Sequence, residues 1–105
     1  MPSAYFVVRA TVSDPAKRAA FDDWYRKEHL PDAVKSFGVT KAWRCWSADD
    51  PSVHQATYQF ADKAAIDRTV KGDEMKRLIA DFNRDWPDIT RTREILVLAE
   101  EWGGA

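Results

Sequence analysis

The chain has 105 residues, which is long enough for one hydrophobic core but not for two, so we expect residues 1–105 to form a single domain. The 16 basic and 17 acidic side chains leave a formal net charge of −1 without a basic run, which argues against a nucleic-acid partner. No segment approaches the roughly 20 apolar residues of a membrane span, and the apolar start of the chain lacks the charged leader of a signal peptide, so neither a membrane partner nor export is expected.

The chain begins with a predicted strand and a predicted helix. Residues 4–12 are rich in β-branched and aromatic side chains, which favour a strand. The Ser-Asp-Pro segment at residues 13–15 combines an N-cap with proline at the first helical position, a usual helix start. We expect this helix to end near Leu30, because Pro31 disfavours its continuation.

A β-hairpin is predicted next. Gly38 precedes an apolar segment at residues 39–47, and a second such segment covers residues 53–60. The Asp-Asp-Pro-Ser sequence between them, residues 49–52, is typical of a turn. We therefore expect two strands that pair with each other.

The last part of the chain predicts more helix and one final strand. Asp62 is a candidate N-cap, and the Lys-Gly-Asp segment at residues 71–73 interrupts the helix, with Gly72 as a stop and Asp73 as a new cap. Helical spacing then continues until Pro87. The apolar residues with this spacing are Met75, Leu78, Ile79, Phe82 and Trp86. Residues 90–99 form the final predicted strand.

This order of elements predicts an α+β, ferredoxin-like sandwich: a four-stranded antiparallel sheet with both helices on one face. Apolar side chains nevertheless point to both faces, since Phe6 and Val8 alternate with Tyr5 and Val7 in the first strand. Because the helices cover one face only, we expect a second copy of the chain to cover the other in a two-fold homodimer. The charged residues that we expect to pair across this contact are Arg9, Arg44 and Glu94.

The most informative segment is FDDWYRKEHLP, which begins at Phe21. A helix turns by about 100° per residue, so Trp24 and Tyr25 flank Phe21 on one face. Glu28 falls near the middle of that face and His29 at its margin. Such a face normally packs on a core, yet a carboxylate is costly to bury without a partner. Glu28 and His29 therefore either close the end of the core through a salt bridge or form the floor of a ligand cavity.

The element order and this segment resemble the dimeric α+β barrel superfamily, and the first helix is most similar to the EthD-like proteins. Their pattern is phenylalanine, two aromatic residues three and four positions on, histidine eight on and proline ten on. The matching residues are Phe21, Trp24, Tyr25, His29 and Pro31. The resemblance in architecture spans nearly the whole chain, whereas the motif covers the first helix only. It implies an EthD-like domain with a small-molecule pocket between sheet and helices in each subunit.

Relatives in this superfamily include lactone isomerases, polyketide cyclases, cofactor-free oxygenases and haem-binding enzymes. The resemblance therefore implies a small enzyme without a cofactor that acts by proton transfer on a compact aromatic or lactone-like metabolite. Two alternatives stay open. One is a binding or stress-linked protein that holds a hydrophobic ligand without converting it, and the other is a haem protein with His29 as axial ligand.

Three residues are candidates for catalysis. The family's histidine corresponds to His29, whose reference pKa of about 6.5 suits a general acid or base; a histidine bonding a carbonyl at a helix end is the structural alternative. Strand alternation places His54 and Tyr58 on one face, which we expect to be the helix side. With His29 they would move a proton and stabilise an enolate or oxyanion, unless they are simply a core tyrosine and a half-exposed histidine.

The candidate substrate-binding residues are Phe21, Trp24, Tyr25, Glu28, Arg44 and Trp46. Arg44 suits a carboxylate substrate, although an ion pair at the dimer contact explains it equally well. Glu28 orients a partner or forms a salt bridge to Arg44 or a lysine. Trp46 belongs with Trp43, Trp86 and Trp102, which are most simply core or interface residues.

Cys45 is the only cysteine, so an internal disulfide is excluded and a cytoplasmic location is expected. Nothing in the sequence indicates an activated thiolate, and we expect Cys45 to be a small buried hydrophobe. Two histidines without metal-ligand spacing argue against a metal site. The sequence contains neither a glycine-rich phosphate loop nor a serine-nucleophile elbow, and no cofactor is expected.

Overall fold

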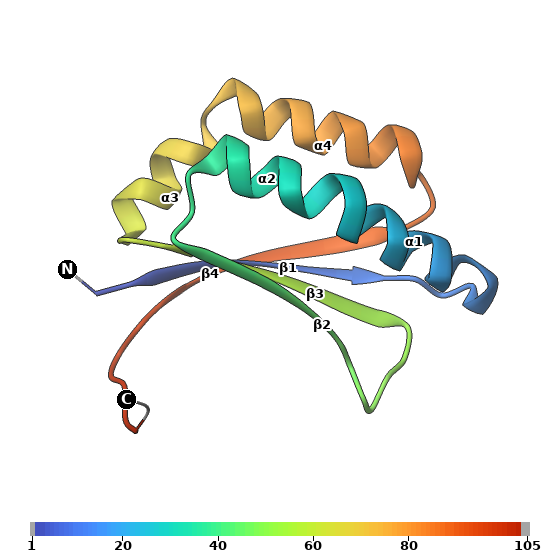
Figure 1. The fold of residues 1–105 in the computed structure, drawn as a ribbon, viewed down its shortest axis with the longest axis horizontal. Coiled ribbons are helices and arrows are strands. Elements are labelled where there is room, and N and C mark those ends of the chain that lie inside the picture. Colours follow the sequence, from blue (N-terminus) through green and yellow to red (C-terminus); the bar gives the residue numbers. More distant parts are fainter. Residues whose placement is uncertain (1, 104–105) are drawn as a thin grey trace.

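A computed structural model describes residues 2–103, and in it one antiparallel sheet carries all the helices on a single face (Figure 1). The strand order across the sheet is β2-β3-β1-β4, as the ferredoxin-like prediction requires. The strands are β1 (Ala4–Thr11), β2 (Lys41–Trp46), β3 (Val53–Phe60) and β4 (Thr90–Val97). All four lie within the predicted segments, and β2 and β3 form the predicted hairpin.

The first helical region runs further than the sequence indicates. Asp14 caps it as predicted, since its Oδ1 accepts from the Ala16 amide at 2.9 Å, but the helix does not end near Leu30. It continues through Pro31 to Gly38, which ends it in the left-handed conformation at φ 63°. The consecutive segments are η1 (Pro15–Lys17), α1 (Arg18–Trp24), η2 (Tyr25–His29) and α2 (Leu30–Phe37).

Pro31 is tolerated because η2 is one turn of π-helix. There the Leu30 amide donates to the Tyr25 carbonyl, five residues back instead of four. The wider turn begins a new helical segment at Leu30, so Pro31 lies in the first turn of α2, where a missing N–H costs no hydrogen bond. The expectation that proline ends this helix was therefore wrong.

The second helical region follows the prediction closely. Asp62 caps α3 (Lys63–Val70) by accepting from the Ala65 amide at 2.9 Å. α4 (Asp73–Asp85) begins after a break at Gly72 and ends before Pro87. Gly72, not Asp73, occupies the N-cap, and Asp73 lies in the first turn, where a carboxylate favours the positive end of the helix dipole.

The core lies between the helices and the inner face of the sheet. Strand pairing places Ala10 of β1 beside His54 of β3, and Phe6 beside Tyr58. These four side chains are at most 4% exposed. His54 and Tyr58 therefore face the helices, as predicted from strand alternation.

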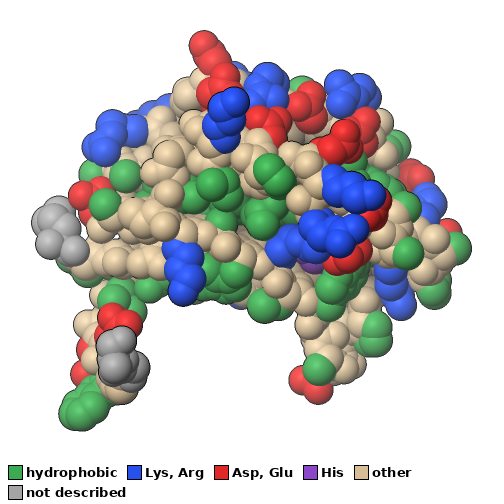
Figure 2. Space-filling view, in the orientation of Figure 1, with side chains coloured by type: hydrophobic (Ala, Val, Ile, Leu, Met, Phe, Trp, Pro, Cys, Tyr) green, Lys and Arg blue, Asp and Glu red, His purple; other side chains and the backbone are tan. Residues whose placement is uncertain are grey.

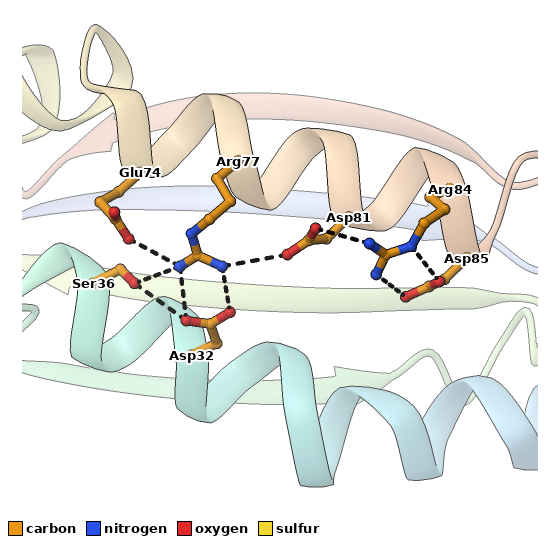
Figure 3. Close-up of polar contacts among 7 residues, drawn as sticks. All are labelled: Asp32, Ser36, Glu74, Arg77, Asp81, Arg84 and Asp85. Atoms are coloured by element: carbon orange, nitrogen blue, oxygen red, sulfur yellow. Dashed lines mark hydrogen bonds and ion pairs between the residues drawn. The ribbon is translucent and has the colours of Figure 1, made fainter.

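A network of ion pairs joins the two long helical segments (Figure 3). The Arg77 guanidinium on α4 donates to both carboxylate oxygens of Asp32 on α2, each at 2.9 Å, and to Ser36 Oγ at 3.1 Å. It also meets Glu74 and Asp81 on its own helix. Arg77 thus fixes α2 against α4 at the outer surface, directly above the space that the two helices enclose with the sheet.

The other face of the sheet carries no helix of the described chain (Figure 1). Tyr5 and Trp43 lie there in edge contact at 6.2 Å, and Leu96 is 42% exposed. Cys45 is also exposed on this face of the single chain, so its expected burial is wrong here. The β2–β3 turn and the segment after β4 project beneath this face (Figure 1), and both stand out as protrusions in the space-filling view (Figure 2). Trp102, which follows β4, is 88% exposed.

The charged residues of the sheet do not share one face. Arg9 pairs with Glu94 at 3.2 Å within the chain, on the helix-free face. Arg44 points to the helix side, where it meets Asp22 of α1 at 2.8 Å. The expectation that Arg44 joins Arg9 and Glu94 at a dimer contact is therefore wrong, because Arg44 follows Trp43 along β2 and lies on the opposite face. Within residues 2–103, no helix combines the length and apolarity that a membrane crossing requires.

Candidate functional site

The π-turn η2 brings two of the candidate residues together. Tyr25 and His29 are its first and last residues, and their ring centroids lie 4.9 Å apart in edge contact. A π-turn is less stable than the α-helix around it and is common at functional sites. Here its effect is to aim a tyrosine and a histidine into the same space beneath the helices.

That space is a narrow cavity of about 30 Å³ between the sheet and the pair α2 and α4. Most of its wall is apolar and comes from β1, α2 and α4. Its polar and charged lining residues are Tyr25, His29, Tyr58, Arg91 and Arg93. No carboxylate of the described chain lines it. A volume of this size is large enough for a molecule about as large as water.

The two tyrosines form a pair of hydroxyl groups at the floor of the cavity. Their oxygens are 3.5 Å apart, and both side chains are buried. Burial raises the pKa of Tyr25, and it raises the pKa of Tyr58 well above the ordinary value, with the neighbouring Tyr25 adding to the effect. Both phenols are therefore protonated at neutral pH and able to donate hydrogen bonds to an oxygen bearing negative charge.

His29 is neutral at physiological pH. Burial, and then the positive charge of Arg91, lowers its pKa to about 4. The reference value of about 6.5 used for the sequence does not apply to this environment. A neutral imidazole has one free nitrogen, which can accept a proton, and one N–H, which can donate.

His29 lies between two hollows. Besides the inner cavity it lines an outer groove of about 150 Å³ between the η2–α2 segment and α4. The acidic residues of that groove are Glu28, Asp32, Asp81 and Asp85. One imidazole thus connects an aromatic interior with a carboxylate-rich surface.

His54 belongs to a separate polar cluster. Arg44 Nη1 lies 3.2 Å from His54 Nε2, and because arginine has only donors, Nε2 accepts and the proton is on Nδ1. Asp22 Oδ1 accepts from both Arg44 and Trp46 Nε1 at 2.8 Å. The hydrogen bonds from Trp46 and then Arg44 lower the pKa of Asp22. Burial, then Arg44, lowers the pKa of His54 to about 4.

The cluster touches the cavity only through Tyr25. The His54 and Tyr25 rings are 4.5 Å apart, yet His54 does not line the cavity. Its Nδ1 is buried and has no hydrogen-bond partner among residues 2–103. His54 therefore packs behind Tyr25, together with Phe21, whose ring is 5.3 Å away.

The structure brings together some predicted site residues and separates others. Tyr25, His29 and Tyr58 share the cavity. Phe21 is fully buried among aromatic rings, and Trp46 and Arg44 belong to the Asp22 cluster. Trp24 and Glu28 line the outer groove instead.

Two expectations for Glu28 are corrected. It does not lie in the middle of the buried face, because the π-turn rotates it outward and its side chain is exposed. It does not pair with Arg44 either, since Arg44 meets Asp22.

Arg91 and Arg93 are cavity residues that the sequence analysis missed. They pair with Ala10 and Val8 of β1, which fixes them on the helix side of β4. The alternation Thr-Arg-Thr-Arg at residues 90–93 is a usable signal, since it places two arginines on one face of a strand. Among residues 2–103, no group of three or more histidine, cysteine or acidic side chains is arranged to hold a metal ion.

No protein-family model matches the sequence, and neither does any curated protein. Solved structures do match the fold. SnoaB, a cofactor-independent oxygenase from Streptomyces nogalater, is 14% identical with a TM-score of 0.73, and the match covers 96% of this chain and 97% of that one.

Two further structures share the fold. An EthD (ethyl tert-butyl ether) family protein from Bacillus halodurans is 19% identical with a TM-score of 0.66, covering 93% of this chain and 99% of that one. A Nitrosomonas europaea protein of unknown function is 21% identical with a TM-score of 0.70, covering 100% and 97%. The described chain therefore shares the ferredoxin-like fold of these structures, and identities below 25% support similarity of fold alone.

Proposed function

We propose that this chain is a small enzyme without a cofactor, which transfers a proton on a compact aromatic or lactone-like substrate held between the sheet and the pair α2 and α4. Isomerisation, cyclisation and cofactor-free oxidation all begin with such a transfer. The observation that supports it is the meeting of one neutral imidazole and two protonated phenols in an aromatic cavity without a carboxylate.

His29 is the acid–base residue in this proposal. Its free nitrogen accepts a proton from an activated C–H or O–H group of the substrate. Its position between the cavity and the outer groove supports a route by which the proton then reaches the carboxylates near solvent. The stacked Trp24 ring, 4.6 Å away, holds the imidazole in place.

Tyr25 and Tyr58 stabilise the negative charge that remains on the substrate. Two O–H donors separated by 3.5 Å suit an enolate or phenolate oxygen placed between them. His54 contributes as a positioning residue, because it packs against Tyr25 from outside the cavity.

The proposal includes a homodimer. The helix-free face of the sheet presents Tyr5, Trp43 and Leu96, and the β2–β3 turn and C-terminal segment project on either side of it (Figure 1). A second copy placed two-fold on this face buries its apolar side chains. The same contact covers Cys45.

Hydrogen–deuterium exchange at carbon tests the proposal without knowledge of the natural substrate. 2-Tetralone, an enolisable aromatic ketone, and α-angelica lactone are incubated with the protein in D₂O and followed by proton NMR. We expect the protein to accelerate exchange of at least one of them, and His29→Ala to lower that rate by roughly 10²-fold or more. Lys27→Ala, an exposed change on the same turn, is the control and keeps the rate.

A binding protein without turnover is the second candidate, supported by the low pKa of His29, which makes it a weak base. In that case both compounds bind but exchange no faster than in buffer. Exchange that is equally fast in His29→Ala and in the unchanged protein would contradict the role given to His29.

A further inference from the structure

Two arginines at the open side of the cavity have no acidic partner. Arg91 donates to Asn83 Oδ1 at 2.7 Å, and its guanidinium lies 3.8 Å above the Phe82 ring, while neither Arg91 nor Arg93 meets a carboxylate of residues 2–103. By contrast, Arg44 and Arg77 each pair with carboxylates at 2.8 to 2.9 Å. Arg93 is exposed, whereas Arg91 is half-buried, where a cation without an acidic partner is costly.

Within the described chain, the hollows beside these arginines are lined by positive side chains and by no negative ones. Both line the inner cavity and an adjoining groove of about 270 Å³, whose other lining residues are Ile79, Asn83 and Ile89. Among residues 2–103, no acidic side chain lines either hollow. The acidic side chains near His29 line the outer groove instead. Positive charge is therefore concentrated on the β4 side of the two hollows.

The groove also provides the room that the inner cavity lacks. The two hollows share Ile79, Arg91 and Arg93, so they adjoin each other. The groove alone is close to the lower end of the size range of small-molecule pockets, roughly 300 Å³. The groove has room for a one-ring compound, whereas the inner cavity would have to widen for the ring to approach Tyr25.

We infer that the ligand of this site is an anion, specifically a small aromatic carboxylate whose carboxylate lies between Arg91 and Arg93. The guanidinium fork matches a carboxylate with two parallel hydrogen bonds. The Phe82 stack and the Asn83 bond hold Arg91 in a fixed orientation for this contact. The inference rests on the proposed function only in taking the same cavity as the ligand site.

Calorimetric titration at low salt with benzoate, and with benzamide as its neutral counterpart, tests the inference. We expect the unchanged protein to bind benzoate at least tenfold more tightly than benzamide. Arg93→Gln, at an exposed position, should lose roughly tenfold in benzoate affinity and keep its benzamide affinity, and Arg91→Gln should behave alike. Arg26→Gln changes the net charge equally on the surface of η2 and should bind benzoate normally.

Equal binding of benzoate and benzamide, no binding of benzoate, or unchanged benzoate affinity in Arg93→Gln would each overturn the inference. Its failure is distinguishable from failure of the proposed function. If benzoate binding depends on Arg93 but no exchange depends on His29, the anion site is supported and the proposed enzymatic function is contradicted. If exchange depends on His29 but benzoate and benzamide bind equally well, the enzymatic function is supported and the anion site is contradicted.

Discussion

The imidazole of His29 stacks on the indole of Trp24, with ring centroids 4.6 Å apart and an angle of 18° between their planes. Trp24 is the last residue of α1 and His29 the last residue of the π-turn, so the stack spans the widened turn. It separates the outer acidic groove from the inner cavity and leaves the histidine edge in contact with both.

Burial of two neutral histidines predicts a loss of stability in mild acid. The pKa values of His29 and His54 are about 4 in the folded chain, against an ordinary value of 6.5. Between these values the unfolded chain binds protons that the folded chain does not, so the free energy of unfolding falls as pH falls. At pH 5 the loss relative to pH 7 is on the order of 2 kcal/mol for each histidine.

Urea unfolding at the two pH values checks this. His29→Phe keeps an aromatic ring on Trp24 and should lose roughly half as much stability on acidification as the unchanged protein. The aspartates whose pKa is lowered titrate below this window, so they do not mask the effect. The same loss in both proteins would show that His29 is not buried as described.

Asp22 and Asp23 are neighbours with different expected roles. Asp22 accepts from Arg44 and Trp46 and so ties α1 to β2, whereas Asp23 pairs only with Arg26 and Lys27 on its own helical segment. We expect Asp22→Ala to cost about 1.5 kcal/mol in the free energy of unfolding, allowing for partial exposure of the carboxylate. Asp23→Ala should cost much less. Denaturant unfolding measures both variants, and an equal loss of unfolding free energy in the two would contradict these different roles.

Arg77 should matter more than Arg84 for the stability of the helix pair. Arg77 joins Asp32 on α2 to α4, while Arg84 meets only Asp81 and Asp85 of its own helix (Figure 3). Arg77→Gln is therefore expected to lower the melting temperature more than Arg84→Gln, most clearly at low salt. The reverse order in differential scanning calorimetry would show that the bridge between the helices contributes nothing.

The proposed dimer predicts a face-specific effect of charge. Leu96 is exposed on the helix-free face, and Val34 is 36% exposed on α2. We expect light scattering to give a dimer for the unchanged protein and for Val34→Glu, but a monomer for Leu96→Glu, because the charge would be buried in the contact. A stable monomer of the unchanged protein at micromolar concentration would rule the dimer out.

The sequence was sufficient for the strands, most caps and the face of the sheet on which His54 and Tyr58 lie. Strand alternation correctly oriented His54 and Tyr58, because a period of two leaves only two choices for a face. Asp14 and Asp62 cap helical segments through their own side chains, which needs no knowledge of distant residues. These features are local, and local rules predict them.

The features that the sequence did not predict depend either on the extra residue of the π-turn or on contacts between distant segments. A period of 3.6 residues cannot reveal the π-turn, which moved Glu28 outward and let the helix pass Pro31. Arg91 and Arg93 became cavity residues only through the pairing of β4 with β1. Arg44 pairs with Asp22, twenty-two positions away in the sequence, because α1 packs on β2.

The most direct test of the small-molecule site is a crystal structure of the protein grown with benzoate. We expect electron density for the ring against Tyr25 and His29, with the carboxylate at Arg91 and Arg93. Density only at other surfaces, with side chains filling the space between the sheet and the pair α2 and α4, would contradict the existence of this site.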